Sequence, residues 1–409
     1  MRRTAIRWTW AILVLAACSG SDWLQFRGTD NRSVSDEKHL ATTFADDENV
    51  AWKAPLPGRG PSSPIVVDGR VVVTCSSGPR QDRLRVLSFD AATGERQWER
   101  QLWATGSTIC NPYGAVANNT PASDGSSIFA FYSSNDLVCF DLEGNLKWLR
   151  GLTYEHPTTR NEAGMGSSPL VVGGVVIVQL ENQGESFVAG IDAADGTTRW
   201  RLERQPDAVW CSPTVLRGNT PDDDLVLLQT RGRFTGHDPR TGEELWVYEA
   251  DCHTIASSTT SGDCIYLPAN GLHALRYDPA ARRVEPLWYE QRLRGGNSSP
   301  VVHDGRVYRI KSPAILVCAD AADGGVLWQV RLKGPIWATP VVADGHLYAV
   351  NHDGLVHVVR LGEQGALVGT SQIDAGILAS PAVAHHAIFF RSDAHLWKVA
   401  LPRAPEANP

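Results

Sequence analysis

The chain has 409 residues, of which 43% are hydrophobic and 20% are charged, and its formal net charge is -7 at pH 7. An acidic chain without clusters of Lys and Arg does not suit nucleic acid, because phosphate contacts need such clusters. A chain of this length would ordinarily form two or three domains.

The first 17 residues have the character of an export signal. Arg2, Arg3 and Arg7 precede an apolar run over residues 8–17, which is too short to span a bilayer. Leu15-Ala16-Ala17-Cys18 resembles a bacterial lipobox, so we expect cleavage before Cys18 and lipidation of its thiol. A simple secreted protein and an uncleaved anchor are the alternatives.

A turn followed by a Trp-bearing strand recurs along the chain, first as Asp90-Ala91-Ala92-Thr93-Gly94-Glu95-Arg96-Gln97-Trp98. The Asp can bond the amides of the turn, Gly supplies a positive φ, and the Trp has a large apolar area to bury. Recurrence at one position indicates a structural role, so we interpret these Asp residues as turn caps and expect Trp98, Trp200, Trp246 and Trp328 to be buried between neighbouring structural units. Further copies run over residues 141–148, 192–200, 238–246, 278–288 and 320–328.

A second motif, a hydroxyl residue followed by Pro and β-branched residues, recurs eight times, with Thr259 in place of Pro in the fifth copy. Its period of about 40–45 residues, filled with short strands and Gly turns, predicts an all-β fold, an eight-bladed β-propeller of four-stranded antiparallel blades. The eight copies begin at Ser63, Thr120, Ser168, Ser212, Ser258, Ser299, Thr339 and Ser380.

These motifs resemble those of the pyrroloquinoline-quinone-type (PQQ-like) β-propeller repeat proteins, whose blades carry Asp-x-x-Thr-Gly-x-x-x-Trp. The opening Asp22-Trp23-Leu24-Gln25-Phe26-Arg27-Gly28 is similar to that of exported bacterial members. The resemblance covers nearly all of the mature chain and implies the fold. The family name records a repeat, so the resemblance does not imply a bound cofactor. A similar fold serves as the lipoprotein scaffold of the outer-membrane barrel-assembly machine.

The two ends of the repeat region complement each other. Residues 50–54 resemble a Trp strand without preceding strands, and residues 380–400 hold three strands without a fourth. We therefore expect the N-terminal strand to close the ring, with Trp52 beside Phe389 and Trp397, which removes an exposed sheet edge. The predicted organisation is a signal peptide at 1–17, a polar leader over one face of the disc at 18–48, a propeller at 49–401 and a disordered tail at 402–409.

Blade seven departs from the pattern, because no Trp lies between Trp337 and Trp397.

Cysteine and histidine do not form a recognisable reactive site. Cys75, Cys139, Cys264 and Cys318 lie in apolar strand runs and are interpreted as small buried hydrophobes, whereas a disulfide among Cys110, Cys211 and Cys252 is possible with its pairing open. No two cysteines are adjacent, so the vicinal disulfide of the quinone alcohol dehydrogenases cannot form. The twelve histidines are spread over turns of different blades. We predict no catalytic residues, no metal site and no cofactor.

The candidate binding site lies where the connections enter the inner strands. The hydroxyl residue before each Pro is constant in type and is interpreted as structural, but the residues two positions earlier vary. They are Pro61, Asn118, Gly166, Trp210, Ala256, Asn297, Trp337 and Leu378. Because these positions converge on the axis, we predict a binding site at the channel mouth, although the Trp residues could instead only plug the channel. Its members are Asn118, Asn119, Trp210, His253, Arg294, Asn297 and Trp337.

The predicted function is that of a non-enzymatic PQQ-like β-propeller binding or scaffold protein of the bacterial cell envelope. We expect a monomer, lipid-anchored and facing the periplasm or secreted, that contacts the membrane only through its anchor and binds an envelope protein or peptide. One alternative is a quinone-dependent dehydrogenase. Another is a carbohydrate-binding surface module using Trp103, Trp210 and Trp337.

Overall fold

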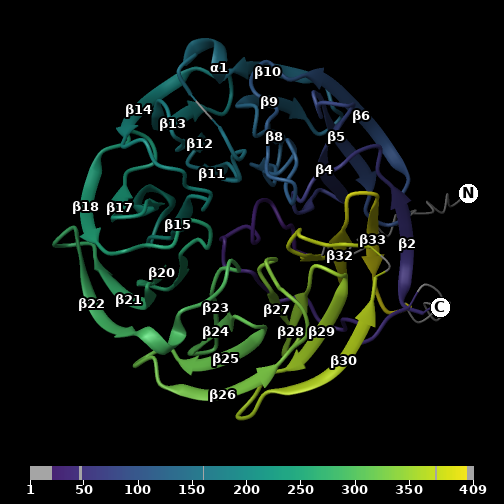
Figure 1. Ribbon diagram of the computed structural model, residues 1–409, viewed down its shortest axis with the longest axis vertical. Helices are drawn as coiled ribbons and strands as arrows, with labels where there is room; N and C mark the ends of the chain where they lie inside the picture. The colour runs from purple at the N-terminus through teal and green to yellow at the C-terminus, as the bar shows by residue number, and fades with distance from the viewer. Residues whose placement is uncertain (1–20, 46–47, 160, 374, 403–409) are drawn as a thin grey trace, which may run out of the picture.

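The computed structural model describes residues 21–45, 48–159, 161–373 and 375–402. In this part of the chain, eight small sheets stand around a central axis, as Figure 1 shows. Neighbouring strands within each blade are antiparallel, and one blade carries an additional parallel strand. The predicted eight-bladed β-propeller is therefore confirmed. The predicted signal peptide, Cys18 and residues 403–409 lie outside the described residues.

The first four blades follow one another in chain order, each running from the axis to the rim. A single turn of helix, α1 (Leu152–Glu155), follows blade two, and a 3₁₀ turn, η1 (Pro221–Asp223), lies in blade four. Their strands are β3 (Ile65–Val67), β4 (Arg70–Ser77), β5 (Arg83–Asp90) and β6 (Arg96–Trp103); β7 (Ala122–Ser123), β8 (Ser127–Phe131), β9 (Asp136–Asp141) and β10 (Leu146–Gly151); β11 (Leu170–Val172), β12 (Val175–Leu180), β13 (Ser186–Asp192) and β14 (Thr198–Arg204); β15 (Thr214–Leu216), β16 (Leu225–Gln229), β17 (Arg233–His237) and β18 (Glu244–Glu249).

The last four blades continue the ring, with the 3₁₀ turn η2 (Gln291–Leu293) between blades five and six. Blades seven and eight each include a strand from the N-terminal part of the chain, β1 (Val34–Ser35) and β2 (Val50–Pro55). The other strands are β19 (Thr259–Ser261), β20 (Cys264–Ala269), β21 (Gly271–Asp278) and β22 (Arg283–Glu290); β23 (Val301–His303), β24 (Arg306–Lys311), β25 (Ile315–Asp320) and β26 (Val326–Arg331); β27 (Val341–Ala343), β28 (His346–Val350), β29 (Leu355–Arg360) and β30 (Ala366–Gln372); β31 (Ala382–Ala384), β32 (Ala387–Arg391) and β33 (His395–Val399).

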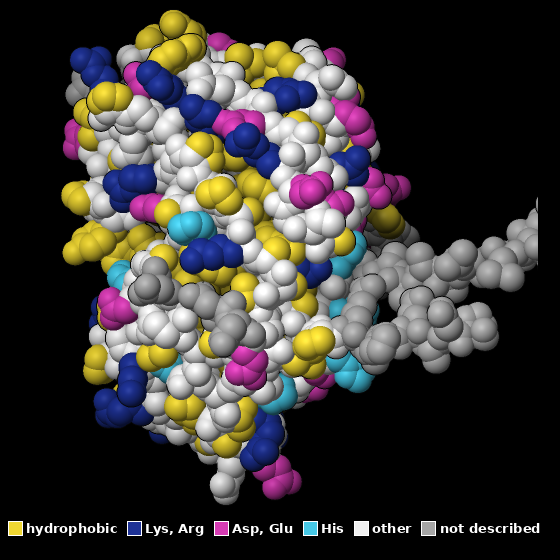
Figure 2. Space-filling model, turned by 90° about the vertical axis from the view of Figure 1, so that its right-hand side faces the viewer, with side chains coloured by type: hydrophobic (Ala, Val, Ile, Leu, Met, Phe, Trp, Pro, Cys, Tyr) yellow, Lys and Arg dark blue, Asp and Glu magenta, His cyan; other side chains and the backbone are white. Residues whose placement is uncertain are grey.

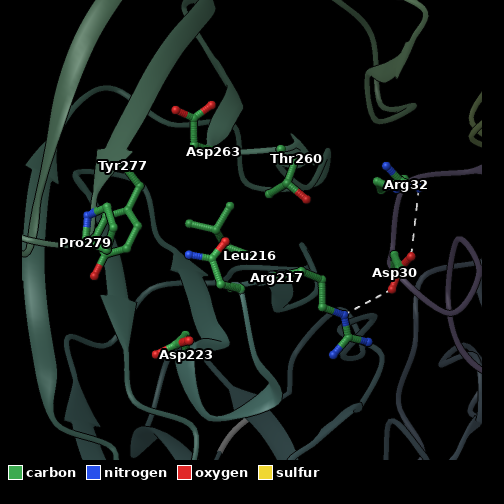
Figure 3. A pocket seen from close by; sticks show the side chains of 12 residues that line it. Asp30, Arg32, Leu216, Arg217, Asp223, Thr260, Asp263, Tyr277 and Pro279 are labelled. Carbon is green, nitrogen blue, oxygen red and sulfur yellow. Dashed lines mark hydrogen bonds and ion pairs between the residues drawn. The ribbon is translucent and has the colours of Figure 1, made fainter.

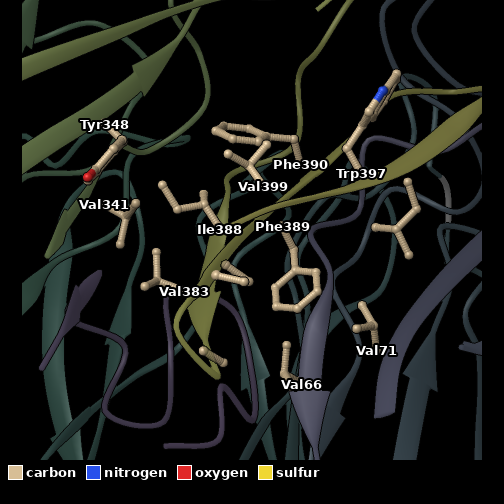
Figure 4. Packing of buried hydrophobic residues seen from close by; sticks show 14 of the residues in the cluster. Val66, Val71, Val341, Tyr348, Val383, Ile388, Phe389, Phe390, Trp397 and Val399 are labelled. Carbon is tan, nitrogen blue, oxygen red and sulfur yellow. The ribbon is translucent and has the colours of Figure 1, made fainter. Parts of the chain in front are cut away.

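The N-terminal strand β2 closes the ring, as predicted. It pairs antiparallel with β33 and forms the outermost strand of blade eight. The Trp52 ring lies 5.9 Å from that of Phe389, and Trp397 belongs to the same apolar cluster. Figure 4 shows how Phe389, Phe390 and Trp397 pack with valines of the neighbouring blades. The seam between the first and last blades is therefore a continuous hydrophobic core.

The recurrent Trp residues join each blade to the next. Trp98, Trp200, Trp246 and Trp328 are at most 9% exposed, which confirms their predicted burial. The indole N–H of Trp200 donates to the Pro239 carbonyl in the next blade's turn at 2.9 Å, and the equivalent bonds of the other docking Trp residues measure 2.8–3.2 Å. In the first turn, Asp90 accepts from the Ala92 and Thr93 amides. The interpretation of the Asp residues as turn caps is confirmed.

Two seams depart from this rule. The buried indole N–H of Trp246 has no hydrogen-bond partner in the described chain, and the next turn has Arg282 in place of the usual Gly. At the seam between blades seven and eight, Gly369 pairs with Val358 at the position where other blades have Trp. Phe44 of the leader is buried there, 5.5 Å from the Phe390 ring, and its amide donates to Ser371. The leader thus supplies the aromatic ring that blade seven lacks.

The leader crosses the disc at the end of the inner strands that is remote from the Pro motifs. Trp23 pairs with Val66 of blade one, Leu24 accepts from Ser123 of blade two, and β1 adds in parallel to β27. Glu37 then accepts from two amides of blade eight. We call this side of the disc the leader face. Basic and acidic side chains are interspersed on the side of the molecule seen in Figure 2. Among the described residues, no helix is long and apolar enough to cross a membrane.

Candidate binding site at the channel mouth

A closed ring of hydrogen bonds surrounds the axis where the inner strands begin. In each blade, the side-chain oxygen of one Ser or Thr accepts from the backbone N–H of the corresponding residue in the preceding blade, at 2.9–3.1 Å. The eight residues, here called the hydroxyl ring, are Ser63, Thr120, Ser168, Ser212, Ser257, Ser299, Thr339 and Ser380. The ring satisfies buried backbone donors, as the recurring hydroxyls predicted.

The structure corrects the predicted alignment of blade five by one residue. Ser257, and not Ser258, belongs to the hydroxyl ring. The residue two positions before the ring is therefore Ile255, which lines the mouth, whereas the predicted Ala256 is buried. Blade five lacks the Pro that marks the position in other blades, and two adjacent serines allowed either alignment.

The residues two positions before the hydroxyl ring line one shared cavity of about 300 Å³. This cavity, here called the mouth pocket, also includes the hydroxyl ring, and Phe26 reaches it from the leader. Its described lining residues include no Asp, Glu, Lys, Arg or His. The mouth pocket therefore combines an apolar, uncharged wall with a ring of hydroxyl groups. Its eight wall positions are Pro61, Asn118, Gly166, Trp210, Ile255, Asn297, Trp337 and Leu378.

Four of the seven predicted site residues line the mouth pocket: Asn118, Trp210, Asn297 and Trp337. Trp210 is held by a hydrogen bond from its indole N–H to the Gly164 carbonyl, at 2.8 Å. The side chains of Asn118 and Asn297 form no hydrogen bond within the described chain, so their amides are available to a ligand. Trp337 is 40% exposed.

The other three predicted residues do not line the pocket. Asn119 is fully buried and its amide donates to the Ser167 carbonyl. Nδ1 of His253 accepts from the Ile255 and Ala256 amides at 3.1 and 3.0 Å, which shapes the connection next to the pocket. Burial, with the positive charges of Arg309 and Arg294 nearby, lowers the pKa of His253 to about 4, so this side chain is a neutral acceptor. Arg294 lies on the exposed surface.

Tyr113 is a pocket residue that the sequence-based site did not include. It lies on the long connection after β6, and its ring is 5.8 Å from that of Trp337 in front of blade seven. His352 completes the aromatic cluster, with its ring 4.9 Å from Trp337. The unusual length of the connection was the available signal, because long loops in compact domains are often functional. Nothing in the sequence indicated which blade the loop would reach.

A second cavity, of about 530 Å³, lies on the leader face between blades four and five (Figure 3). It is lined by charged residues, some of which already pair with one another. Arg217 donates to Asp30 at 3.0 Å and to Asp224 at 2.6 Å, and these two carboxylates neutralise its charge. The two faces of the disc therefore differ in character, since the mouth pocket has an uncharged lining.

The described mouth residues do not fit a quinone dehydrogenase centre. Alcohol oxidation needs a base within reach of the substrate hydroxyl, and the lining has none. No cluster of three His, Cys, Asp or Glu side chains that could hold a metal ion occurs among the described residues. Cys110 is the one cysteine of the lining.

All cysteines in the described part of the chain are free thiols, including Cys110, Cys211 and Cys252, which the sequence left open to pairing. Cys75, Cys139 and Cys318 are buried, as expected, whereas Cys264 is only partly buried. Burial raises the pKa of Cys139 and Cys252 to about 12, so these thiols are protonated and unreactive at neutral pH.

Comparison with known proteins supports the fold and indicates a family. The family model described as "Outer membrane protein assembly factor BamB" matches residues 26–167, 158–263 and 280–368. The protein of that name from Yersinia pestis is 22% identical over 317 residues, covering 73% of this chain and 75% of its own length.

Solved structures of similar fold include both a BamB protein and quinone enzymes. BamB from Moraxella catarrhalis has a TM-score of 0.62 at 15% identity, covering 88% of this chain and 99% of its own. A quinohemoprotein alcohol dehydrogenase from Comamonas testosteroni has a TM-score of 0.70 at 14% identity, covering 95% of this chain and 82% of its own. At such identities the likeness concerns the fold alone.

Proposed function

The chain belongs to the family of the outer membrane protein assembly factor BamB, and we propose that it is a non-enzymatic scaffold of the bacterial cell envelope. In this proposal, the mouth face binds a protein or peptide partner that takes part in outer membrane protein assembly. The observation that carries the proposal is the mouth pocket. Its exposed Trp337 and unpaired Asn118 and Asn297 amides suit recognition, and its lining lacks a catalytic base.

The path of the leader supports a lipid anchor at Cys18. The described chain begins at Ser21, whose amide donates to Glu37 at 2.9 Å, so the anchor would emerge close to the leader face. A monomer anchored in this way, in a membrane bordering the periplasm, would turn the leader face toward the bilayer and leave the mouth pocket open to partners.

Replacement of Trp337 tests the proposed binding face. We expect Trp337→Ala to abolish capture of the partner from envelope extract while the melting temperature changes little, because the ring is partly exposed. Trp103→Ala is the matched control, since Trp103 is 59% exposed at the rim, in β6, away from the mouth pocket. If Trp337→Ala lowers the melting temperature and the folded fraction still captures the partner, the Trp is a plug and the proposal fails.

Two other functions have their own readouts. A quinone-dependent dehydrogenase would gain alcohol-oxidising activity and quinone absorbance on reconstitution with the cofactor, which we do not expect from this lining. A carbohydrate-binding module would bind neutral oligosaccharides on a glycan array. Trp103 lies at the rim and Trp337 at the axis. A loss of oligosaccharide binding in both Trp103→Ala and Trp337→Ala would therefore favour that module, because a site confined to the mouth pocket would depend on Trp337 alone.

A further inference from the structure

The hydroxyl ring has unused hydrogen-bond donors. Each ring oxygen accepts a backbone N–H, and none of the eight hydroxyls donates to an acceptor within the described chain. All eight residues line the mouth pocket. A hydroxyl that accepts a hydrogen bond is polarised and becomes a better donor. The base of the pocket therefore offers several converging O–H donors to an acceptor on the axis.

Three fully buried arginines surround this ring. Arg27 donates to the Ser258 carbonyl at 2.6 Å, Arg309 donates to the Ser298 carbonyl, and Arg391 donates to the Ser62 carbonyl at 2.9 Å. Each of these carbonyls belongs to a direct neighbour of a hydroxyl-ring residue. The arginines thus place three positive charges next to the base of the pocket.

No carboxylate among the described residues neutralises the charges of Arg27 and Arg309, whereas Asp393 lies near Arg391. None of the ion pairs in the described chain involves Arg27, Arg309 or Arg391, and Asp393 near Arg391 is paired with Arg59. Nε and Nη1 of Arg27 and Nε and Nη2 of Arg309 are buried without a partner. Burial lowers the pKa of Arg27 to about 9 and that of Arg309 to about 10, and both groups remain charged at neutral pH. Buried, uncompensated cations favour an anion nearby.

We propose, building on the proposed function, that the mouth pocket binds the C-terminal carboxylate of a polypeptide whose last side chain is apolar. The hydroxyl ring donates to the carboxylate, and the buried arginines supply the compensating charge. The last side chain packs against Trp210 and Trp337, and the amides of Asn118 and Asn297 bond the peptide backbone. Phe26 of the leader occupies the far end of the pocket, so a chain terminus fits better than a continuous segment.

Calorimetric titration of the purified full-length protein tests this inference with two probes. One is acetyl-Ala-Ala-Phe with a free carboxylate, and the other is the same peptide with a C-terminal amide. We expect the carboxylate peptide to bind at least about tenfold more tightly, and acetate to compete with it. Equal affinities, tighter binding of the amide, or no binding of either peptide would overturn the inference. A third probe is an amidated peptide with an internal Asp. If it binds more tightly than the carboxylate peptide, the inference is also overturned, because the site would then recognise a side chain.

Charge variants localise the effect. Asn118→Asp puts a carboxylate on the pocket wall and should reduce the preference for the carboxylate peptide at least tenfold, whereas Asn219→Asp, on the exposed leader face, should retain it. Arg27→Gln should reduce the same preference, with its fold checked by the melting temperature. A preference that survives both Asn118→Asp and Arg27→Gln would place the site elsewhere. If both peptides bind equally but partner capture still requires Trp337, the carboxylate assignment fails and the proposed function stands.

Discussion

At the scale of single residues, the docking tryptophans combine burial with a directed hydrogen bond. The indole of Trp200 packs over Gly242 of the next blade, where a Cβ atom would lie 2.7 Å from the ring, and its N–H reaches the Pro239 carbonyl. Apolar burial stabilises the seam, and the hydrogen bond fixes its register. The Asp-x-x-Thr-Gly turn is therefore the docking site for the Trp of the preceding blade.

Truncation of a docking tryptophan measures the strength of a seam. Trp200→Ala should lower the free energy of unfolding by about 3–5 kcal/mol, because it leaves a cavity between two blades. Trp103→Ala, which removes a 59% exposed ring, should change it by less than about 0.5 kcal/mol. Equal urea midpoints for the two variants would contradict the docking role.

A pair of glycine variants separates backbone strain from the loss of docking. Gly242 and Gly262 both have positive φ, but a Cβ at Gly262 meets nothing within 4 Å. Gly262→Ala should cost only the strain of a positive φ, about 1 kcal/mol. Gly242→Ala should lower the melting temperature clearly more, since it also displaces Trp200. A smaller effect at Gly242 than at Gly262 would be inconsistent with this packing.

His253 makes the protein sensitive to acid. In the unfolded chain its imidazole takes up a proton near pH 6.5, whereas in the folded protein its pKa is about 4. The unfolded state thus binds more protons between these values, and stability falls as the pH is lowered from about 6.5 to 4. In His253→Gln, whose amide oxygen can accept the same N–H groups, the difference in melting temperature between pH 7.5 and pH 5 should be smaller. An unchanged difference would argue against this role.

At the scale of elements, the leader completes blades that the repeat leaves unfinished. It contributes β1 to blade seven and Phe44 to the seam between blades seven and eight, and β2, which follows the leader, completes blade eight. Phe44 occupies the place of a docking ring, because Gly369 stands where other blades have Trp. Blade seven can therefore lack a docking Trp because the leader supplies the ring that packs in its place.

Loss of the Phe44 ring should weaken this seam specifically. Phe44→Ala should cost about 3–5 kcal/mol, the usual range for a buried aromatic ring, and should increase amide hydrogen exchange in β30 and β33. Tyr154→Ala is a suitable control, because Tyr154 is 76% exposed. If β30 and β33 exchange their amide hydrogens at the same rates in Phe44→Ala as in the parent protein, the leader does not support the seam.

The sequence predicted those elements that repeat and those that are missing a partner. The docking Trp residues repeat, and β2 and the three-stranded last blade are complementary fragments, so both could be inferred. The position of Phe44, the reach of Tyr113 and the buried arginines around the hydroxyl ring occur once each, and they depend on contacts between distant segments. Blade five was misaligned by one residue because its Pro marker is absent.

At the scale of the whole molecule, the ring of blades is closed by the pairing of β2 with β33. A chain that starts after Ala54 lacks β1, β2 and Phe44, so it should unfold or aggregate with an open sheet edge at β33. Size-exclusion chromatography and thermal melting of this truncation provide the measurement. A monomeric truncation with the melting temperature of the full chain would show that closure by β2 is dispensable.

The pairing of β2 with β33 also sets the order of events during biogenesis. A chain that is synthesised N-terminus first delivers β2 long before residues 395–399 emerge. Until then the half-built ring has an unpaired strand at one end and an unfinished sheet at the other, and both invite misassociation. Contacts so distant in sequence also form slowly. The interval between the arrival of the first and the last blade is therefore the period when unpaired strands of this chain are most exposed to misassociation.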